Sequence, residues 1–347
     1  MITNSTTPAL CLDDLTLIPA PYSLITSRKE CNPYINTKGA LPLFTAPMSS
    51  IIDETNWVTF ANEGISTIIP RTVPIEIRLE LMTQTFIAVS VEEFIKFFCT
   101  PENQKSLHKT LTENNQKAYI CLDIANGHVK AFIDLCEGVK KEFRDKVQIM
   151  AGNIANPAAY MLYVQAGIDY VRVGIGTGSQ CTTSANTGVH FPMATLLEYI
   201  NNIKSAIKDV PKPKIVADGG FKNYDDIIKA LALGADYVML GKVFAECQEA
   251  CGPIKSIWRN GKEVFMREYF GMSTKKAQSL MGKSELKTSE GISSMVEVKY
   301  PLKKYVTNFK DYLRSALSYA NCRDVSEFRR KAVLTVISPL ARNTYFK

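Results

Sequence analysis

The chain has 347 residues, of which 46% are hydrophobic and 22% are charged, and this composition is typical of a globular protein. No apolar run approaches the roughly 20 residues that would span a membrane. The N-terminus lacks the basic stretch and apolar core of a secretory signal. We therefore expect a cytoplasmic protein without a membrane partner. The length allows either one closed α/β barrel or two smaller domains.

The net charge is +7, and the Lys and Arg residues are spread along the chain rather than clustered with aromatic residues. Nucleic acid is therefore not an expected partner, and an anionic small molecule explains the positive excess equally well. The nine cysteines are scattered without paired C-x-x-C spacing, and in a reducing compartment they are expected to remain thiols.

Short β-branched or apolar runs alternate with amphipathic segments along the chain, and this alternation predicts a parallel sheet that closes as a single-domain (β/α)8 TIM barrel. The expected strands are Leu43–Ala46, Ser66–Ile69, Phe86–Val89, Ala118–Leu122, Gln148–Ala151, Tyr170–Val173, Lys214–Ala217 and Tyr237–Leu240. The expected helices include Val129–Glu142, Pro157–Ala166, Ala194–Ile207 and Asp225–Leu233.

The remaining parts of the single domain 1–347 are expected to be additions to the barrel. Residues 1–40 form an N-terminal extension, residues 275–300 a mobile flap, and residues 305–347 a helical segment. Within that segment, apolar periodicity over Phe309–Ala320 and Phe328–Ile337 predicts a last helix that packs on the barrel.

Polar or glycine-rich motifs follow most of the expected strands, where TIM barrels carry their functional residues. The most informative is the stretch 174–188, GIGTGSQCTTSANTG, which places Cys181 in a glycine-rich loop after a strand. Backbone N–H groups of such a loop suit a phosphate or a thiolate, and the hydroxyls of Thr182 and Thr183 lie beside the sulfur in sequence. Cys181 is therefore a candidate nucleophile.

Two further motifs are typical of a phosphate site. Asp218-Gly219-Gly220 and Gly241-Lys242 end the seventh and eighth strands, where a barrel commonly binds phosphate on backbone N–H groups. A phosphate would repel Asp218, so this carboxylate is expected to accept hydrogen bonds from ribose hydroxyls, or else to cap a helix.

Taken in order, these motifs resemble the inosine-monophosphate dehydrogenase and guanosine-monophosphate reductase family. The resemblance runs from Leu12 to Ile337, and its most specific part is the G-x-G-x-G-S-x-C-T-T loop followed by D-G-G and then G-M-S. The segments that carry it are Leu43–Ser50, Ile120–His128, Met150–Ile154, Val173–Gly188, Val216–Gly220, Val238–Gly241, Tyr269–Ser273 and Ser289–Gly291.

Within this family the resemblance favours the reductase activity, in which GMP is converted to IMP and ammonia with NADPH through a thioimidate on the cysteine. No regulatory domain of the CBS type is inserted between Arg71 and Asp123, the segment Lys275–Lys287 lacks the Arg-Tyr pair of the dehydrogenases, and Ser289-Glu290-Gly291 resembles the reductase motif. Ile292 follows Glu290-Gly291, and the resulting E-G-I sequence instead resembles the dehydrogenase motif. A dehydrogenase without its regulatory domain, converting IMP to XMP with NAD, therefore stays open.

The resemblance implies roles for individual residues. Cys181 is the expected nucleophile, with Thr183 and Glu290 as the pair that protonates departing ammonia. The expected nucleotide-binding residues are Ser179, Asp218, Gly219, Gly220, Gly241, Lys242, Gly271, Met272, Ser273, Lys287, Ser289 and Gly291. The expected residues for NADPH are Asp123, Ala125, Asn126, Ile175 and Gly176 at the nicotinamide, and Ser27, Arg28, Arg71 and Ser315 at the adenosine end, partly from a neighbouring subunit of a homotetramer.

The resemblance also implies a potassium ion (K+) on backbone carbonyls of Gly176, Gly178 and Cys181. The loop departs from the reductase pattern, however, because Thr177, Gln180 and Ser184 stand in place of proline, valine and arginine. A less rigid loop is expected. Lys287 replaces a usual arginine, Ser49-Ser50 a usual Asp-Thr, and Lys242 a usual glycine, which suggests a divergent member of the family.

Two functions outside this chemistry are the alternatives. A regulatory protein that binds purine nucleotides without turnover would not need Cys181, Thr183 and Glu290, all of which are present. A flavin-binding barrel would share the late glycine motifs but not the C-T-T sequence, and its purified protein would be yellow. Catalysis in purine nucleotide salvage is the favoured hypothesis.

Overall fold

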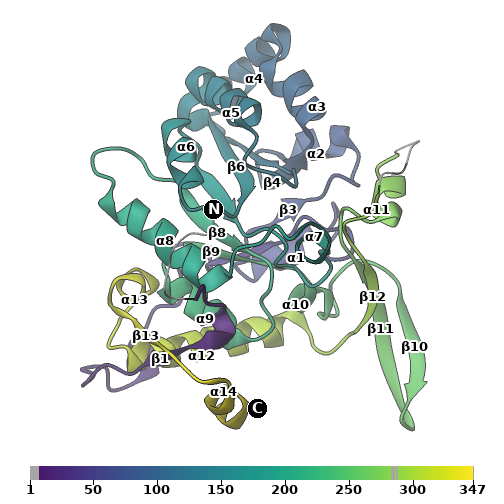
Figure 1. The fold of residues 1–347 in the computed structure, drawn as a ribbon. Coiled ribbons are helices and arrows are strands. Elements are labelled where there is room, and N and C mark those ends of the chain that lie inside the picture. The colour runs from purple at the N-terminus through teal and green to yellow at the C-terminus, as the bar shows by residue number, and fades with distance from the viewer. Residues whose placement is uncertain (1–7, 283–285, 287, 347) are drawn as a thin grey trace.

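The computed structural model describes residues 8–282, 286 and 288–346. Eight strands form one parallel sheet in the order β2-β9-β8-β7-β6-β5-β4-β3 (Figure 1). Its two ends meet because Phe44 in β2 bridges Ser66, just before β3. The Thr45 N–H donates to the Ser66 carbonyl, and the Ser66 N–H donates to the Leu43 carbonyl. The predicted (β/α)8 barrel is therefore confirmed.

The barrel strands lie where the apolar runs predicted them, with ends that differ by no more than three residues. They are β2 Leu43–Thr45, β3 Ile68–Ile69, β4 Phe86–Val89, β5 Ala118–Leu122, β6 Val147–Ile154, β7 Tyr170–Val173, β8 Lys214–Asp218 and β9 Tyr237–Leu240. Each run is almost wholly buried, as expected for a parallel sheet covered by helices on one side and filled by side chains on the other.

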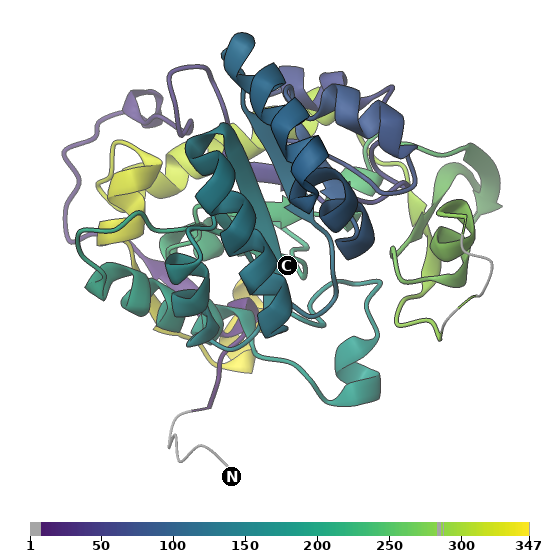
Figure 2. The same ribbon diagram turned by 90° about the horizontal axis from the view of Figure 1, so that it is seen from above.

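The helices cover the outside of this sheet, as the view from above also shows (Figure 2). The four predicted helices correspond to α5 Lys130–Phe143, α6 Ala159–Gln165, α8 Met193–Ala206 and α9 Tyr224–Ala232. The other helices between barrel strands are α1 Trp57–Asn62, α2 Ile75–Leu81, α3 Val91–Phe94, α4 Pro101–Glu113 and α7 Thr183–Thr187. After β9 come α10 Lys242–Ala245, α11 Lys275–Leu280, α12 Leu302–Tyr319, α13 Val325–Lys331 and α14 Pro339–Tyr345.

An aromatic cluster fills the end of the barrel at which the strands begin. Phe44 packs against Phe86 and Tyr237, with ring centroids 5.6 and 4.8 Å apart, and Tyr170 contacts all three rings. Phe86, Tyr170 and Tyr237 are each the first residue of their strand. Because this end is filled by large rings, the opposite end, where the strands finish, is the one that has room for a site.

Two smaller sheets were not predicted. Strands β10 Ile254–Arg259, β11 Lys262–Phe270 and β12 Ser293–Glu297 form an antiparallel sheet that projects from the barrel beside α11 (Figure 1). Strand β1 Leu15–Ile18 pairs with β13 Val333–Val336. The expected helix over Phe309–Ala320 corresponds to α12, which ends one residue earlier at Tyr319, but the prediction of helix over Phe328–Ile337 is wrong after α13, which ends at Lys331. Val333-Leu334-Thr335-Val336 is rich in β-branched residues and is extended because β1 supplies its hydrogen-bond partners.

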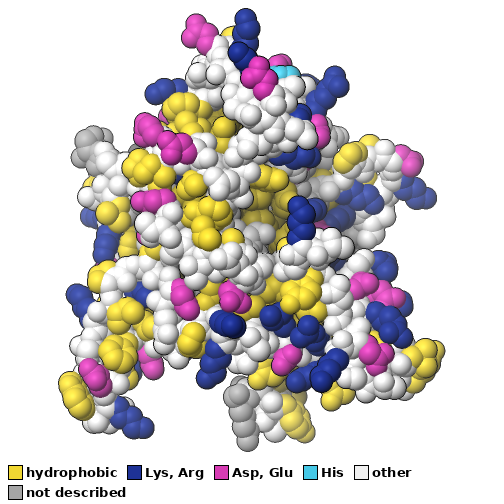
Figure 3. Space-filling model, turned by 180° about the vertical axis from the view of Figure 1, so that it is seen from behind, with side chains coloured by type: hydrophobic (Ala, Val, Ile, Leu, Met, Phe, Trp, Pro, Cys, Tyr) yellow, Lys and Arg dark blue, Asp and Glu magenta, His cyan; other side chains and the backbone are white. Residues whose placement is uncertain are grey.

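Surface and redox features agree with the composition. All nine cysteines are free thiols. Among the described residues, no helix is long and apolar enough to cross a membrane. On the face shown in Figure 3, Lys and Arg side chains are interspersed with Asp and Glu.

Candidate functional site

A cavity of about 470 Å³ lies at the carboxyl ends of the barrel strands. Residues at or just after the carboxyl ends of β2, β3, β5, β6, β7 and β8 line it, together with the end of β11, the segment after it and part of the expected flap. Among the predicted site residues, the cavity is lined by Arg71, Asp123, Ala125, Ile175, Gly176, Gly178, Cys181, Thr183, Asp218, Gly219, Gly271, Met272, Ser273 and Glu290. The tertiary structure thus brings most of them to one place.

The three predicted catalytic side chains form a continuous hydrogen-bonded chain. The Cys181 thiol lies 3.2 Å from Thr183 Oγ1, and the Thr183 hydroxyl donates to Glu290 Oε2 at 2.6 Å. Backbone contacts hold the two segments together, because the Thr182 N–H donates to the Glu290 carbonyl and the Ile292 N–H donates to the Gln180 carbonyl. A thiol, a hydroxyl and a carboxylate in this order can move a proton to or from a group bound at the sulfur.

Local structure explains why Cys181 and Thr183 face each other. The Cys181 N–H donates to the Gly178 carbonyl and closes a tight turn directly before α7, which begins at Thr183. The side chains of residues 181 and 183 therefore share one side of the turn. Glu290 comes from a segment more than 100 residues away and reaches them through the backbone pairing of Cys181 with Gly291.

A buried arginine joins two of the predicted carboxylates. Arg172 in β7 binds Asp123 Oδ1 at 3.0 Å and Asp218 Oδ2 at 2.9 Å, and Arg71 binds Asp123 Oδ2 at 3.0 Å. Burial raises the pKa of Asp123, but the charges of Arg71 and Arg172 outweigh it, so that the net pKa lies below the ordinary value. The Asp218 carboxylate also accepts a hydrogen bond from Asn153 Nδ2 at 2.7 Å.

The predicted phosphate glycines lie where side chains would clash. A Cβ at Gly241 would collide with Tyr269 Oη, and one at Gly219 would lie 2.8 Å from Thr177 Oγ1. Gly219 and Gly220 both have a positive φ, +85° and +87°, a backbone conformation that favours glycine. The Tyr269 hydroxyl lies 3.7 Å from Met48 Sδ, and burial raises the pKa of Tyr269 although the neighbouring Ser179 lowers it in part. Lys242 begins α10 and is exposed.

Residues expected at the base edge lie against the loop that carries the nucleophile, because Gly291 pairs with Cys181. A Cβ at Gly291 would lie 2.8 Å from Ser273 Oγ, and one at Gly271 would lie 3.3 Å from the Gln180 carbonyl. The Ser289 hydroxyl donates to the Gly291 carbonyl at 2.6 Å. Lys287 lies outside the described residues.

The residues expected for the cofactor fall into two groups. Arg71, Asp123, Ala125, Ile175 and Gly176 line the cavity, and the neighbouring Asn126 caps a turn by accepting from the His128 N–H. Ser27, Arg28 and Ser315 do not line it. They lie together at another place, where Arg28 Nη1 donates to Ser315 Oγ at 3.3 Å and pairs with Asp311.

Several residues that line the cavity were not predicted from the sequence. Arg172 could have been recognised from the sequence, because it is a charged residue within an otherwise apolar strand. Asn153, Met48 and Tyr269 lie in segments that carried the resemblance, but no role was assigned to them. Thr177 was seen only as a departure from proline, whereas its hydroxyl donates to the Asp218 carbonyl at 2.6 Å.

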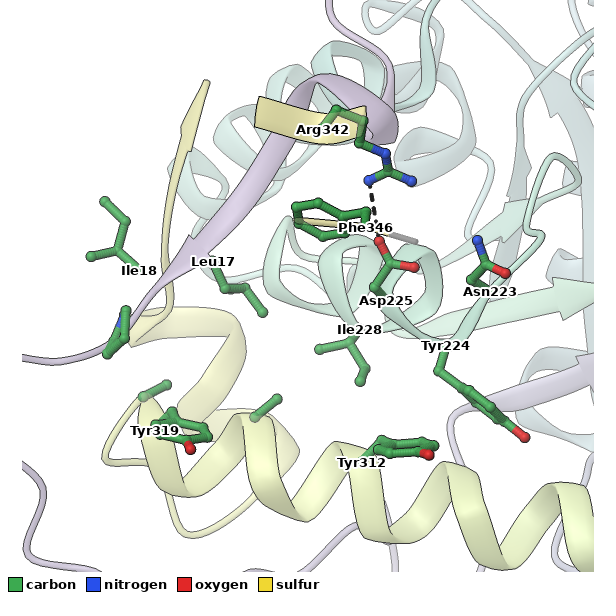
Figure 4. A pocket seen from close by; sticks show the side chains of 13 residues that line it. Leu17, Ile18, Asn223, Tyr224, Asp225, Ile228, Tyr312, Tyr319, Arg342 and Phe346 are labelled. Carbon is green, nitrogen blue, oxygen red and sulfur yellow. Dashed lines mark hydrogen bonds and ion pairs between the residues drawn. The ribbon is translucent and has the colours of Figure 1, made fainter. Parts of the chain in front are cut away.

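A larger cavity, of about 830 Å³, lies away from the strand ends, between β1, α9, α12 and α14 (Figure 4). Its lining includes Ile18, Ile228, Tyr312 and Tyr319, and it is mostly apolar. The acidic residue at its edge, Asp225, is neutralised within the protein by Lys229 at 2.9 Å and Arg342 at 3.3 Å.

Comparison with known proteins agrees with this arrangement. Residues 9–343 match the model of the IMP dehydrogenase / GMP reductase domain. The GMP reductase of Bacillus licheniformis is 32% identical over 320 residues, which are 91% of this chain and 93% of that protein. The GMP reductase of Clostridium acetobutylicum is 32% identical over 340 residues, 96% of each chain. The GMP reductase of Bacillus subtilis is 31% identical over 320 residues, again 91% and 93%. The chain therefore belongs to the IMP dehydrogenase / GMP reductase family.

Proposed function

We propose that this protein is an oxidoreductase acting on a purine nucleotide, and specifically a GMP reductase that converts GMP and NADPH to IMP, ammonia and NADP+. The observation that carries the proposal is the chain of hydrogen bonds from Cys181 through Thr183 to Glu290. This arrangement offers a nucleophile for a purine carbon and a proton donor for a departing amine within one cavity. Relatives named GMP reductase support the same activity.

The reaction begins at Cys181. Its sulfur adds to C2 of the guanine ring, and the bond between C2 and the exocyclic amine then breaks. The proton of the Cys181 thiol passes through the Thr183 hydroxyl to Glu290 as the C–S bond forms, and it returns by the same path to the departing amine as the C–N bond breaks. The product of this half-reaction is ammonia and a thioimidate in which Cys181 remains bonded to C2.

The second half-reaction removes the cysteine from the purine. Bound NADPH would supply the hydride that C2 needs, and Cys181 would then leave C2 with the electron pair of the C2–S bond, so that IMP is released. The contribution of the protein would be alignment of both reacting molecules beside the sulfur, which is supported by the position of Cys181 in the wall of the cavity.

The nucleotide is proposed to lie across the glycine motifs. Its phosphate would bind near Ser179, Gly219, Gly220, Gly241, Lys242 and Ser273, and its base near Met272, Lys287, Ser289 and Gly291. The ribose would donate to Asp218. Three donors, from Asn153 and Arg172, already bind Asp218 Oδ2, and within the described part of the chain no donor reaches Oδ1. That second oxygen is the acceptor we assign to a ribose hydroxyl.

The cofactor is proposed to be NADPH, with its nicotinamide near Asp123, Ala125, Asn126, Ile175 and Gly176. The adenosine end would lie near Arg71 and, from a neighbouring subunit of a homotetramer, near Ser27, Arg28 and Ser315. The separation of this second group from the cavity is compatible with such an arrangement. A cytoplasmic role in purine nucleotide salvage, and a flap over residues 275–300, remain part of the proposal.

Potassium at the carbonyls of Gly176, Gly178 and Cys181 stays a prediction from the resemblance. Two of these carbonyls already accept hydrogen bonds, from Ser184 Oγ at 3.2 Å and from the Cys181 N–H at 2.9 Å. The loop contacts described here therefore lend the ion no support.

One assay separates the reductase from the dehydrogenase alternative, which Ile292 in the E-G-I sequence keeps open. Purified protein is mixed with GMP and NADPH, and both the absorbance of reduced nicotinamide and the released ammonia are followed. Oxidation of NADPH with one ammonia per turnover is expected. Formation of NADH from IMP and NAD, with no reaction of GMP, would instead identify a dehydrogenase.

A further inference from the structure

The loop that carries Cys181 is tied down by hydroxyl groups at two positions where this chain departs from the reductase pattern. These positions are Thr177 and Ser184, which stand in place of proline and arginine. From the sequence, the loss of proline predicts a looser loop. The contacts of the two hydroxyls lead to the opposite conclusion.

Thr177 links the nucleophile loop to the end of β8. Its hydroxyl donates to the Asp218 carbonyl at 2.6 Å. A Cβ at Gly219 would lie 2.8 Å from the same oxygen, and one at Gly174 would lie 3.1 Å from it. The Thr177 hydroxyl therefore occupies the space between two glycine turns, and it joins the Cys181 loop to the residue expected to bind ribose.

Ser184 performs a similar role from the first turn of α7. Its hydroxyl donates to the Gly176 carbonyl at 3.2 Å, and a Cβ at Gly176 would lie 2.8 Å from Ser184 Cβ. The Cys181 N–H donates to the Gly178 carbonyl at 2.9 Å. Protein donors thus reach two of the three carbonyls that the resemblance assigns to potassium.

A cation bound to carbonyl oxygens replaces its hydration shell with them and holds their dipoles in one arrangement. In this loop, the Ser184 hydroxyl and the Cys181 amide donate to the carbonyls of Gly176 and Gly178, and a second hydroxyl, that of Thr177, joins the loop to β8. We propose that Thr177 and Ser184 are positioning residues that hold the nucleophile loop, so that turnover in this protein does not depend on potassium.

The test measures turnover of GMP and NADPH in chloride salts of potassium, sodium and tetramethylammonium at equal ionic strength. This readout rests on the proposed reductase function. We expect rates that agree within about two-fold, since no cation has to complete the loop. Saturable activation by potassium of about ten-fold or more over tetramethylammonium would overturn the inference.

A second readout does not require any turnover. The rate at which iodoacetamide alkylates Cys181 is followed by mass spectrometry in the same three salts. Equal rates are expected, and a rate that changes with potassium alone would overturn the inference. If GMP is not reduced in any salt, the proposed function fails, and this alkylation rate still decides whether potassium shapes the loop.

Variants identify the groups that act. Thr177→Val removes the hydroxyl and keeps the shape of the side chain, and we expect kcat to fall at least about ten-fold, because small misplacement of reacting groups is costly. Thr177→Ser should restore most of this loss, and Ser184→Ala should also lower kcat. The control is Thr110→Val, in an exposed threonine whose hydroxyl bonds only within α4. Unchanged kcat in both Thr177→Val and Ser184→Ala would contradict the positioning role.

Discussion

The two cavities of this protein differ in what their polar groups face. In the smaller cavity, at the strand ends, a thiol, a hydroxyl and a carboxylate form one chain, and a buried arginine joins two further carboxylates. The larger cavity beside α12 is mostly apolar, and its carboxylate Asp225 is already neutralised by Lys229 and Arg342 (Figure 4). The proposed chemistry is therefore assigned to the smaller cavity, although its volume is the lesser one.

The difference follows from the architecture. Six barrel strands end at the smaller cavity, so that loops distant in sequence place different functional groups around one space. The larger cavity lies outside the barrel between helices and a two-stranded sheet, and the rings of Tyr312 and Tyr319 on its wall are exposed side chains of α12. The following experiments test whether the two cavities differ in function as they differ in structure.

Replacing the nucleophile should have the largest effect. We expect Cys181→Ala to lower the turnover of GMP with NADPH by at least about 10³-fold, because no other group can form the thioimidate. The thermal unfolding temperature, measured by circular dichroism, should stay close to that of the wild type. Residual turnover within ten-fold of the wild type would rule out covalent catalysis by this residue.

Interrupting the proton path should have the next largest effect. Glu290→Gln keeps the size of the side chain, and Thr183→Val keeps the shape, but each removes a proton donor or acceptor from the chain of contacts. We expect kcat to fall about 10²-fold in each variant, with a smaller change in KM. Steady-state kinetics with ammonia detection measures both constants. A change confined to KM would show that the pair only binds substrate.

Removing the buried arginine should destabilise the fold as well as the site. Arg172→Met leaves Asp123 and Asp218 without their shared partner, and we expect a loss of about 3–5 kcal/mol in the free energy of unfolding. Urea denaturation followed by fluorescence measures this loss. Lys222→Met breaks an exposed pair with Asp13 and serves as the matched control, with an expected change under about 1 kcal/mol. Equal effects of the two variants would show that burial of the arginine pair is unimportant.

The stability should depend on pH through Asp123. Its pKa in the folded protein is lowered because Arg71 and Arg172 outweigh the effect of burial. A carboxyl group with a lowered pKa stabilises the fold at a pH above its unfolded pKa of about 3.9, and that contribution is lost as the pH falls through the folded pKa. Urea midpoints should therefore differ between wild type and Asp123→Asn at pH 7, and the difference should shrink in acid below about pH 4. A difference that is constant with pH would contradict this origin.

The smallest effect is expected in the larger cavity. Tyr319→Ala removes an exposed ring from its wall, and we expect kcat and KM to change by less than about two-fold, because no group of the larger cavity contacts the nucleophile loop. The same assay as for Cys181→Ala measures it. A loss of turnover comparable to that of Glu290→Gln would mean that the two cavities are coupled.

The barrel and the candidate nucleophile could be predicted from the sequence alone. Eight short buried runs recur with amphipathic segments between them, and a parallel sheet covered by helices is the arrangement that buries both. Cys181 was recognisable because its loop is local, and the same holds for the glycines near Asp218. The resemblance to the family then predicted that Thr183 and Glu290 are the catalytic partners of Cys181.

The contacts between segments that are distant in the chain could be found only in the tertiary structure. Glu290 meets Thr183 across 107 residues, Arg172 joins Asp123 to Asp218, and β13 is extended because β1 lies beside it. Local periodicity describes only neighbours within a few residues, so it cannot show which charge is neutralised or which edge is paired. For the same reason the sequence could not show that the Thr177 hydroxyl, which the fold places against the Asp218 carbonyl, donates a hydrogen bond to it.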